Sequence, residues 1–412
     1  MNRKNLALAC AALACAASAH AAPHGHQTVS YIGDPSFNTA WMVDWNAATH
    51  TAHLVDSAGA GDGTWTDDGT LRVLTLATPI ETMQEGFDCN GLPFTQAVDL
   101  RQVAIRHVSG GAHQGSAQVL ELGTTTDQGG CTPGLVTPYG SLDDAGTATS
   151  YLDMAHRPGT EDLRHGATLA GMSDTDAAGA VDPTQLVARI VTFGHHALTF
   201  ANSGASVPRD VVDGWFVLDF GGFQRAYTRL SVDPTTHAEA WLGAAWRDGA
   251  PTTIFQTMMV RPNAAAGFGG HAAQSHVWDS GLFLQSPTFV LFHLYPDFTG
   301  SFEQKARDGS ADARMPATWG DSGANVVISR SFDFTVQYRT RTWVPIANYG
   351  SAHFVLENED RHIVADGSVT PAILPRVNFY VDEGQATPPA AAPAVKTLAR
   401  QAAAAPARGT QR

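Results

Sequence analysis

Histidine is the side chain in this sequence that is best suited to proton transfer and metal binding at neutral pH. The chain contains 17 histidines. No His-Glu-x-x-His motif or Cys/His zinc spacing is present, and adjacent residues of a strand point to opposite faces. We therefore expect scattered strand or surface histidines, and a transition metal bound by distant histidines stays an alternative. Pairs that stand near each other in sequence include His24 and His26, His195 and His196, and His271 and His276.

A second candidate metal site is a run of acids from residue 174. Asp174, Asp176 and Asp182 occupy the first, third and ninth positions of a stretch that resembles the start of an EF-hand calcium loop, with Gly at the sixth. The stretch departs from that pattern at Ala178 and again at Gln185, where a bidentate Glu is needed. We expect a solvated loop here, with weak calcium binding as the alternative.

The string Gly320-Asp321-Ser322-Gly323 resembles the nucleophile segment of chymotrypsin-like proteases. The resemblance covers four residues, and no upstream His and Asp stand in recognisable settings. The same residues align with Thr66-Asp67-Asp68-Gly69, which has an Asp where the nucleophile would be. Asp, Ser and Gly are favoured in tight turns, so we predict a turn between two strands.

Carboxylates offer a third chemistry, because two acids that face each other can hydrolyse a glycoside. Glu121 and Glu357 recur in equivalent positions of an internal repeat, which favours a structural or surface role. The sequence therefore does not single out a catalytic pair. The acids near strands or strand ends are Glu81, Glu85, Glu121, Glu239 and Glu357.

The first 21 residues have the layout of a secretory signal. Arg3 and Lys4 precede an apolar run over 6–17, and Ala19-His20-Ala21 supplies a small-x-small cleavage pattern. Acylation of Cys15, as in a lipoprotein, is the rival interpretation. No later segment has the 18 apolar residues that indicate a transmembrane helix. We therefore expect an exported protein, periplasmic or extracellular.

Cysteine usage agrees with export. Cys10 and Cys15 lie within the signal, so the mature chain keeps Cys89 and Cys131. Two cysteines in an oxidising compartment allow one pairing, and we predict a Cys89–Cys131 disulfide. Free thiols are the alternative.

Between the signal and residue 384 the dominant sequence period is two. Val, Ile, Thr, Phe, Tyr and Trp alternate with polar residues, and 40 Gly and 22 Pro supply turns. Helical signals are limited to Asp182-Pro183 before 184–190 and to a short stretch over 149–156. We predict a mainly β protein with little helix, built of antiparallel meander units that form sandwich- or barrel-like modules.

Two segments repeat the same pattern of a Trp, an Asp/Gly turn and an apolar strand. They begin at Gly63 and Ala317, and each continues into an Arg-bearing strand and then a Gly-Ser-Ala strand. A more compact third copy is indicated from Asp213, with Trp215 as its anchor. The predicted organisation is a signal over 1–21, a first β module over 22–183, a second β region of one or two repeats over 184–384, and a disordered Ala/Pro-rich tail over 385–412.

The charge of the chain excludes a nucleic-acid binder. The formal charge is −14, with 25 basic and 39 acidic residues. Six of the basic residues lie in the signal and the tail, so 19 remain against all 39 acids in the middle. We expect a non-catalytic protein that binds a small ligand, a glycan or an envelope component. The alternative is an exported hydrolase that acts on a polysaccharide or a peptide through carboxylates or a metal–His site.

Overall fold

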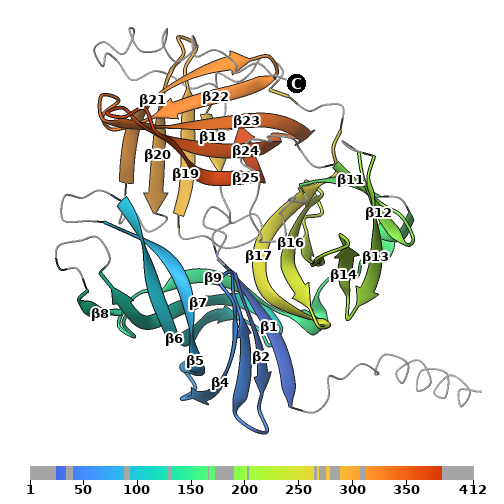
Figure 1. The fold of residues 1–412 in the computed structure, drawn as a ribbon. Coiled ribbons are helices and arrows are strands. Elements are labelled where there is room, and N and C mark those ends of the chain that lie inside the picture. Colours follow the sequence, from blue (N-terminus) through green and yellow to red (C-terminus); the bar gives the residue numbers. More distant parts are fainter. Residues whose placement is uncertain are drawn as a thin grey trace, which may run out of the picture.

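A computed structural model shows three β modules in chain order (Figure 1). In the part of the chain that the structure describes, all strand pairings are antiparallel and the helical elements are short 3₁₀ turns, so the predicted fold class is confirmed. No helix in the described part of the chain is long and apolar enough to cross a membrane. The structure describes residues 25–33, 40–87, 93–127, 132, 134–165, 167–171, 190–201, 204–263, 267–268, 275–278, 288–306 and 312–382.

The first module is a closed ring of eight strands with a ninth strand outside it. The sheet order is β6-β5-β4-β3-β2-β1-β9-β7-β8, and an additional β6–β7 pairing closes the ring. The ring strands are β1 (His26–Ile32), β2 (Ala40–Asn46), β3 (Thr51–Val55), β4 (Ala60–Asp67), β5 (Leu71–Phe87), β6 (Pro93–Gly110), β7 (Gln114–Thr126) and β9 (Thr147–Asp153). Strand β8 (Val136–Tyr139) pairs with β7 alone among the described strands.

The second and third modules are closed eight-stranded barrels. Two 3₁₀ turns, η2 (Met154–His156) and η3 (Glu161–His165), connect the first module to the second. The second barrel contains β10 (Thr168–Ala170), β11 (Ile190–Phe193), β12 (Ala197–Phe200), β13 (Ser206–Val212), β14 (Trp215–Asp219), β15 (Gln224–Val232), β16 (Ala238–Arg247) and β17 (Ala250–Val260). The third contains β18 (Ser275–Trp278), β19 (Thr288–Leu294), β20 (Thr299–Ala306), β21 (Asp312–Ser322), β22 (Asn325–Arg330), β23 (Gln337–Tyr349), β24 (Ala352–Ile363) and β25 (Val369–Asp382).

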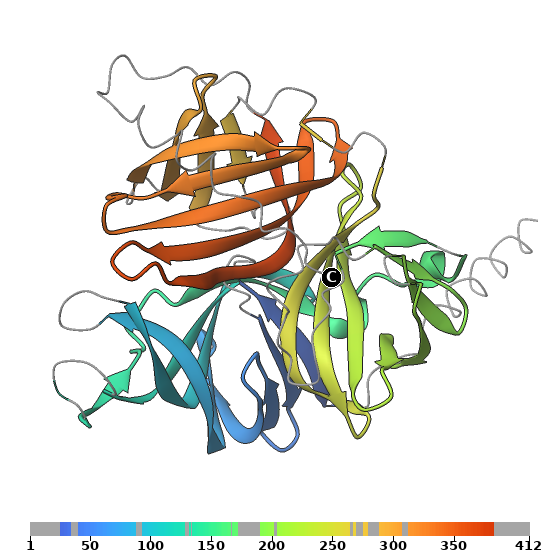
Figure 2. The same ribbon diagram turned by 45° about the horizontal axis from the view of Figure 1, so that its top comes forward.

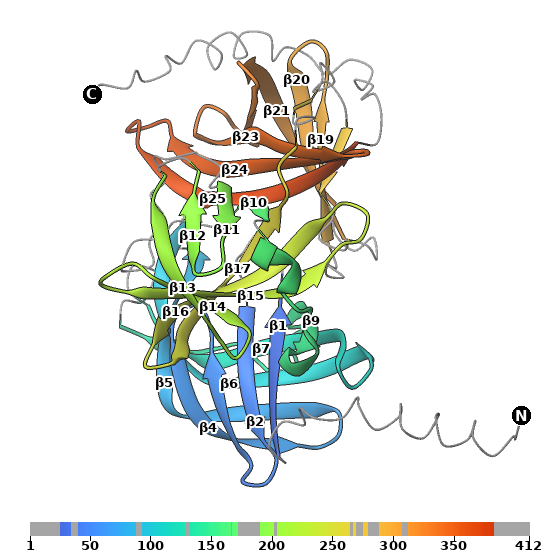
Figure 3. The same ribbon diagram turned by 90° about the vertical axis from the view of Figure 1, so that its right-hand side faces the viewer.

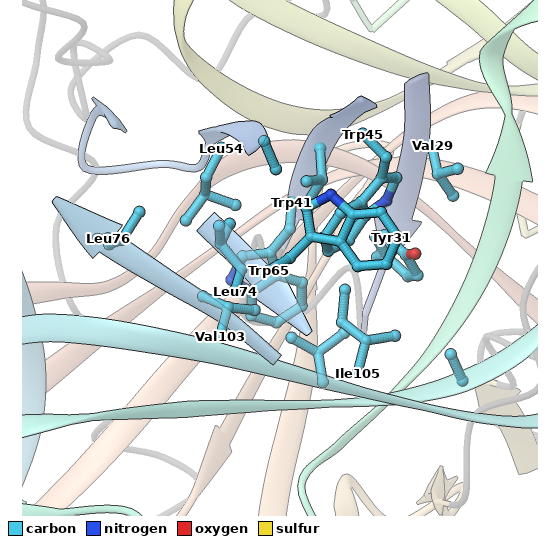
Figure 4. Close-up of a cluster of buried hydrophobic side chains, with 14 of the residues drawn as sticks. Val29, Tyr31, Trp41, Trp45, Leu54, Trp65, Leu74, Leu76, Val103 and Ile105 are labelled. Carbon is cyan, nitrogen blue, oxygen red and sulfur yellow. The ribbon is translucent and has the colours of Figure 1, made fainter. Parts of the chain in front are cut away.

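Each barrel is filled by its own side chains. In the first barrel Trp41, Trp45 and Trp65 lie in an apolar cluster to which all eight ring strands contribute (Figure 4). Separate clusters fill the second barrel around Trp241 and the third around Trp343. This packing follows from the period of two, because alternate residues of a strand point into the ring.

The barrels lie against one another (Figures 2 and 3), and apolar residues on their outer faces form the junctions. Met42 and Val55 of the first barrel pack against Trp215 and Leu242 of the second. Met258 of the second barrel belongs to a cluster with residues of β23, β24 and β25. Strands at these junctions are therefore buried on both faces, as the pattern of β16 shows.

The two short helices expected from sequence have different outcomes. Residues 149–153 belong to β9, so the helix expected over 149–156 is wrong except for the single turn of η2. Residues 184–189 lie outside the described part of the chain, and Ile190 begins β11. The expected module boundary at 183 and 184 also lies outside it. Strands β10 and β11, which stand on either side of this boundary, pair in one barrel.

The repeat of the first and last copies is confirmed in the structure. The backbone amide of Trp65 donates to the carbonyl of His50 over 2.9 Å, and that of Trp319 donates to Phe298 over 3.0 Å. His50 and Phe298 have positive φ values of 55° and 65°, and each ring packs on its Trp. The string Gly320–Gly323 forms the β21–β22 turn, as the repeat predicts.

The alignment of Trp215 with these two Trp residues is wrong. In the second barrel Arg209 takes the equivalent place, because its amide donates to the carbonyl of His196 over 2.9 Å. The Arg209 guanidinium lies over the Phe216 ring, 4.8 Å from its centroid. Trp215 begins the next strand and packs in the junction with the first barrel.

Candidate functional site

Several residues singled out from sequence lie outside the described part of the chain. These are the calcium candidates Asp174, Asp176 and Asp182, the cysteines Cys89 and Cys131, and His24 and His271. The calcium site and the disulfide therefore stay predictions. The signal at 1–21 and the tail at 385–412 also lie outside.

The recurring glutamates occupy the seventh strand of the three rings and accept hydrogen bonds from tryptophan indoles. Trp41 Nε1 donates to Glu121 over 2.8 Å, Trp241 Nε1 to Glu239 over 3.1 Å, and Trp343 Nε1 to Glu357 over 3.2 Å. The three tryptophans come from three different strand positions, so only the acid repeats. The predicted structural role of Glu121 and Glu357 thus agrees with the structure.

The environments of Glu121 and Glu239 shift their pKa values. Burial raises the pKa of Glu121, and the hydrogen bond from Trp41 only partly opposes it. Burial also raises the pKa of Glu239, although Arg229 lies 3.4 Å away and opposes the shift. Arg229 in turn holds Asp162 of η3 at 2.8 Å and ties this connecting turn to the second barrel.

The third barrel contains a larger network of buried charges. Glu359 is fully buried and contacts Arg330 at 2.9 Å, Arg341 at 3.0 Å and Arg339 at 3.2 Å. Arg341 also donates to the hydroxyl of Tyr380 over 3.0 Å. Because Glu359 is held by these internal arginines, its carboxylate has a structural role.

The facing pair of acids required by a glycoside hydrolase is not formed by the recurring glutamates. Glu121, Glu239 and Glu357 lie in three different barrels, each within its own ring. Glu81 is exposed on β5. These described acids therefore supply no catalytic pair of the kind considered from sequence.

The outer face of the first barrel carries a separate apolar cluster. Ala104, Leu120 and Leu122 are buried there, with Leu71 and Val73 against them. Residues 136–146, which we call the β8 segment, cover this cluster. Gly146 takes a positive φ of 70° and lies against Leu120, where a Cβ atom would come within 2.8 Å of the Leu120 side chain.

A hollow of about 490 Å³ lies where the β8 segment meets β5, β6 and β7. Leu76 and Leu122 are the buried residues of its lining. Leu122 belongs to the outer cluster, whereas the Leu76 side chain packs in the barrel interior. Exposed Arg101 and Ser141 stand among its polar residues. Its described lining contains no acidic residue. The lining is Thr75, Leu76, Ala77, Pro79, Arg101, Gln102, Leu122, Gly123, Tyr139, Gly140, Ser141 and Leu142.

This hollow has the features of a small-ligand site. Ligand pockets of about 300–1,000 Å³ typically combine an apolar lining with a few polar groups. Leu142 in this lining exposes 44% of its surface. A second hollow of about 430 Å³ at the β14–β15 and β16–β17 turns contains Arg225 and Arg247, but also Asp219 and Asp248.

One cluster of titratable residues was missed from sequence. His113 lies in the β6–β7 turn, Asp153 ends β9, and His156 ends η2. Their ligand atoms all lie within 4.8 Å of one another. The Asp-x-x-His spacing of Asp153 and His156 was the local signal, but nothing in the sequence connects His113 to it.

The fold and these features define an antiparallel β protein of three linked eight-stranded rings. No family model matches the chain, and no curated protein matches it. The solved structure titled "The Structure of Intact Ap-TbpB (N and C lobes)" is similar at 9% identity, over 88% of this chain and 68% of that chain, with a TM-score of 0.24. This score is too low to carry an argument about function.

Proposed function

We propose that the protein is a non-catalytic binding protein, and that the hollow beside the β8 segment binds a small amphipathic ligand. The observation that carries this proposal is buried Leu122 and exposed Leu142 beside Arg101 in an acid-free lining. An apolar group would lie on Leu122 and Leu142, and an anionic or hydrogen-bond-accepting group would lie near Arg101.

The position of the hollow on the outer face agrees with the packing of the barrels. Their interiors hold large aromatic side chains, such as Trp241 and Trp343, that are fully buried. The strand edge of β8 is a weaker candidate for binding. It has four residues, and Pro138 lacks an amide hydrogen, which are features that protect an edge from strand addition.

The fluorescent probe 8-anilinonaphthalene-1-sulfonate tests this site, because it combines aromatic rings with an anion. We expect Arg101→Gln to weaken its binding to the mature protein about tenfold, since a hydrogen bond to a charged group contributes about 1.5–3 kcal/mol. Ala77→Trp should also weaken binding, because Ala77 is exposed in the lining and the indole would fill the hollow. Fluorescence titration measures both effects.

The matched control is Arg247→Gln, which removes an exposed arginine from the second hollow. Circular dichroism should show the same strand content in all variants. Unchanged probe binding in both Arg101→Gln and Ala77→Trp, or an equal loss in Arg247→Gln, would exclude the proposed site.

Export is part of the same proposal and rests on the N-terminal segment and the cysteines. We expect the mature chain to begin at Ala22 and its Cys89 and Cys131 to resist alkylation until a reductant is added. Mass spectrometry of the purified protein, with and without reduction, measures both. Two thiols that react without a reductant would disprove the disulfide.

A further inference from the structure

Three segments that are distant in sequence meet at one end of the first barrel. The β6–β7 turn contributes His113, whose backbone carbonyl accepts a hydrogen bond from the amide of Asp153 over 2.7 Å. Asp153 begins the turn of η2, because its Oδ1 accepts from the amide of Ala155 over 3.0 Å. His156 follows one turn later. The backbone thus holds the three side chains together without a ligand.

Both imidazoles approach the same carboxylate oxygen. Nδ1 of His113 lies 3.4 Å from Oδ2 of Asp153, and Nδ1 of His156 lies 3.3 Å from it. The two rings stack with centroids 3.5 Å apart and planes 26° from parallel. Gln27 Nε2 also donates to Oδ2, over 3.2 Å, and holds the carboxylate in place.

The distances from both imidazole nitrogens to the Asp153 oxygen suit a tetrahedral metal ion. To bind it, the half-exposed rings would rotate out of their stack so that both nitrogen lone pairs point at the ion. Zinc binds histidine nitrogen and carboxylate oxygen at about 2.0–2.2 Å, so two ligand atoms at a tetrahedral angle lie about 3.3–3.5 Å apart. Asp153 is buried, with 7% of its surface exposed, whereas the side chains of His113 and His156 are about half exposed. The site therefore has a fixed base and an open side toward solvent.

We propose that His113, Asp153 and His156 bind a divalent transition metal ion of the zinc type. Two imidazoles and one carboxylate favour such an ion over calcium or magnesium, which prefer oxygen ligands. The other imidazole–carboxylate contacts of the described residues have a different composition. His26–Asp44, His53–Asp62, His293–Glu303 and His353–Asp382 each join one imidazole to one carboxylate.

The position of the site gives the metal a structural consequence. His156 ends the turn that leaves the first barrel, and the next residue, Arg157, donates to the carbonyls of Met154 and Asp213. Asp213 precedes β14 of the second barrel. A metal ion on His113 and His156 would therefore fasten the connection between the two barrels to the β6–β7 turn.

Calorimetric titration of the chelator-treated mature protein with Zn²⁺ tests the site. We expect one tight site, and at least about tenfold weaker binding in His113→Ala and in His156→Ala, since even outer-shell changes cost about 10–100-fold. Asp153→Asn should weaken binding similarly while its side-chain oxygen still accepts from Ala155, which keeps the turn intact. Co²⁺ should give visible absorption bands typical of a four-coordinate site in the wild type, and the variants should lose them.

His53→Ala and His26→Ala are the matched controls, because among the described residues each removes a histidine that contacts a single carboxylate. They should leave Zn²⁺ affinity within about twofold. The proposal is overturned if His113→Ala and His156→Ala bind Zn²⁺ as tightly as the wild type. It is equally overturned if the controls lose as much affinity as these variants.

Discussion

Replacing Glu359 by Gln should lower the free energy of unfolding of the third barrel by about 3–5 kcal/mol, the cost of breaking a buried ion pair from one side. Arg330 and Arg341 each expose only 7% of their surface, and in the variant both lose the carboxylate that they share. The amide nitrogen of Gln would also face guanidinium donors. Urea denaturation at pH 7 measures the loss, and hydrogen exchange of β22–β24 amides assigns it to this barrel.

The effect of this substitution should depend on pH in a defined direction. Burial by itself raises the pKa of Glu359, but the charges of Arg341, Arg330 and Arg339 outweigh it and lower the pKa from 4.5 to about 2. A carboxylate whose pKa is lower in the folded state stabilises the fold at pH values above its pKa in the unfolded state. This stabilisation is lost as the pH falls through its pKa in the folded state. The difference between wild type and Glu359→Gln should therefore be full above about pH 4.5 and shrink toward pH 2.

Arg339→Gln is the control for the network. Its side chain is 38% exposed and contacts the same carboxylate at 3.2 Å. Because solvent screens exposed pairs, we expect a loss of at most about 1 kcal/mol. If Glu359→Gln costs no more than Arg339→Gln, the buried network does not stabilise the barrel.

Replacing Trp241 by Ala should destabilise the second barrel by about 3–5 kcal/mol, as is typical for a buried aromatic residue. The indole is fully buried and stacks with Phe193 and Phe216, at centroid distances of 6.3 and 6.0 Å. Truncation leaves a cavity between these rings and removes the indole donor from Glu239. Urea denaturation with hydrogen exchange of β11, β14 and β16 reports the change.

Trp241→Phe separates the two contributions. Phenylalanine refills most of the space but cannot donate to Glu239, so we expect a smaller loss of about 1–3 kcal/mol. Equal losses in the Phe and Ala variants would assign the whole effect to the hydrogen bond. No loss in the Phe variant would show that packing alone matters.

The sequence was informative wherever the decisive pattern is local. Alternation over two residues predicts which side chains of a strand share a face, and it correctly predicted antiparallel meanders and the turn at Gly320–Gly323. The recurrence of Glu121 and Glu357 likewise reflects one position in a repeated unit. The middle copy was aligned wrongly at Trp215, because Arg209 performs the equivalent packing with a different side chain.

The second face of each strand could not be predicted from this pattern. Strand β16 is buried on both sides, because Trp241 fills its own barrel while Leu242 packs against the first barrel. Alternation describes one sheet and does not state which neighbour covers its outer face. The hollow beside the β8 segment depends on the same kind of information, since Arg101 and Tyr139 meet only when residues 136–146 fold over β5–β7.

By itself, then, the sequence determined a mainly β chain of repeated antiparallel units with an acidic middle and a glutamate that recurs at one position of the repeat. Only the tertiary structure decided that these units close into three rings, and that His113 lies beside Asp153 and His156. The physical reason is the range of the forces involved. The alternation of apolar and polar residues along a strand is set by residues that are adjacent in sequence. Ring closure instead brings together residues such as His113 and Asp153, which are 40 positions apart, through backbone pairing that no local pattern encodes.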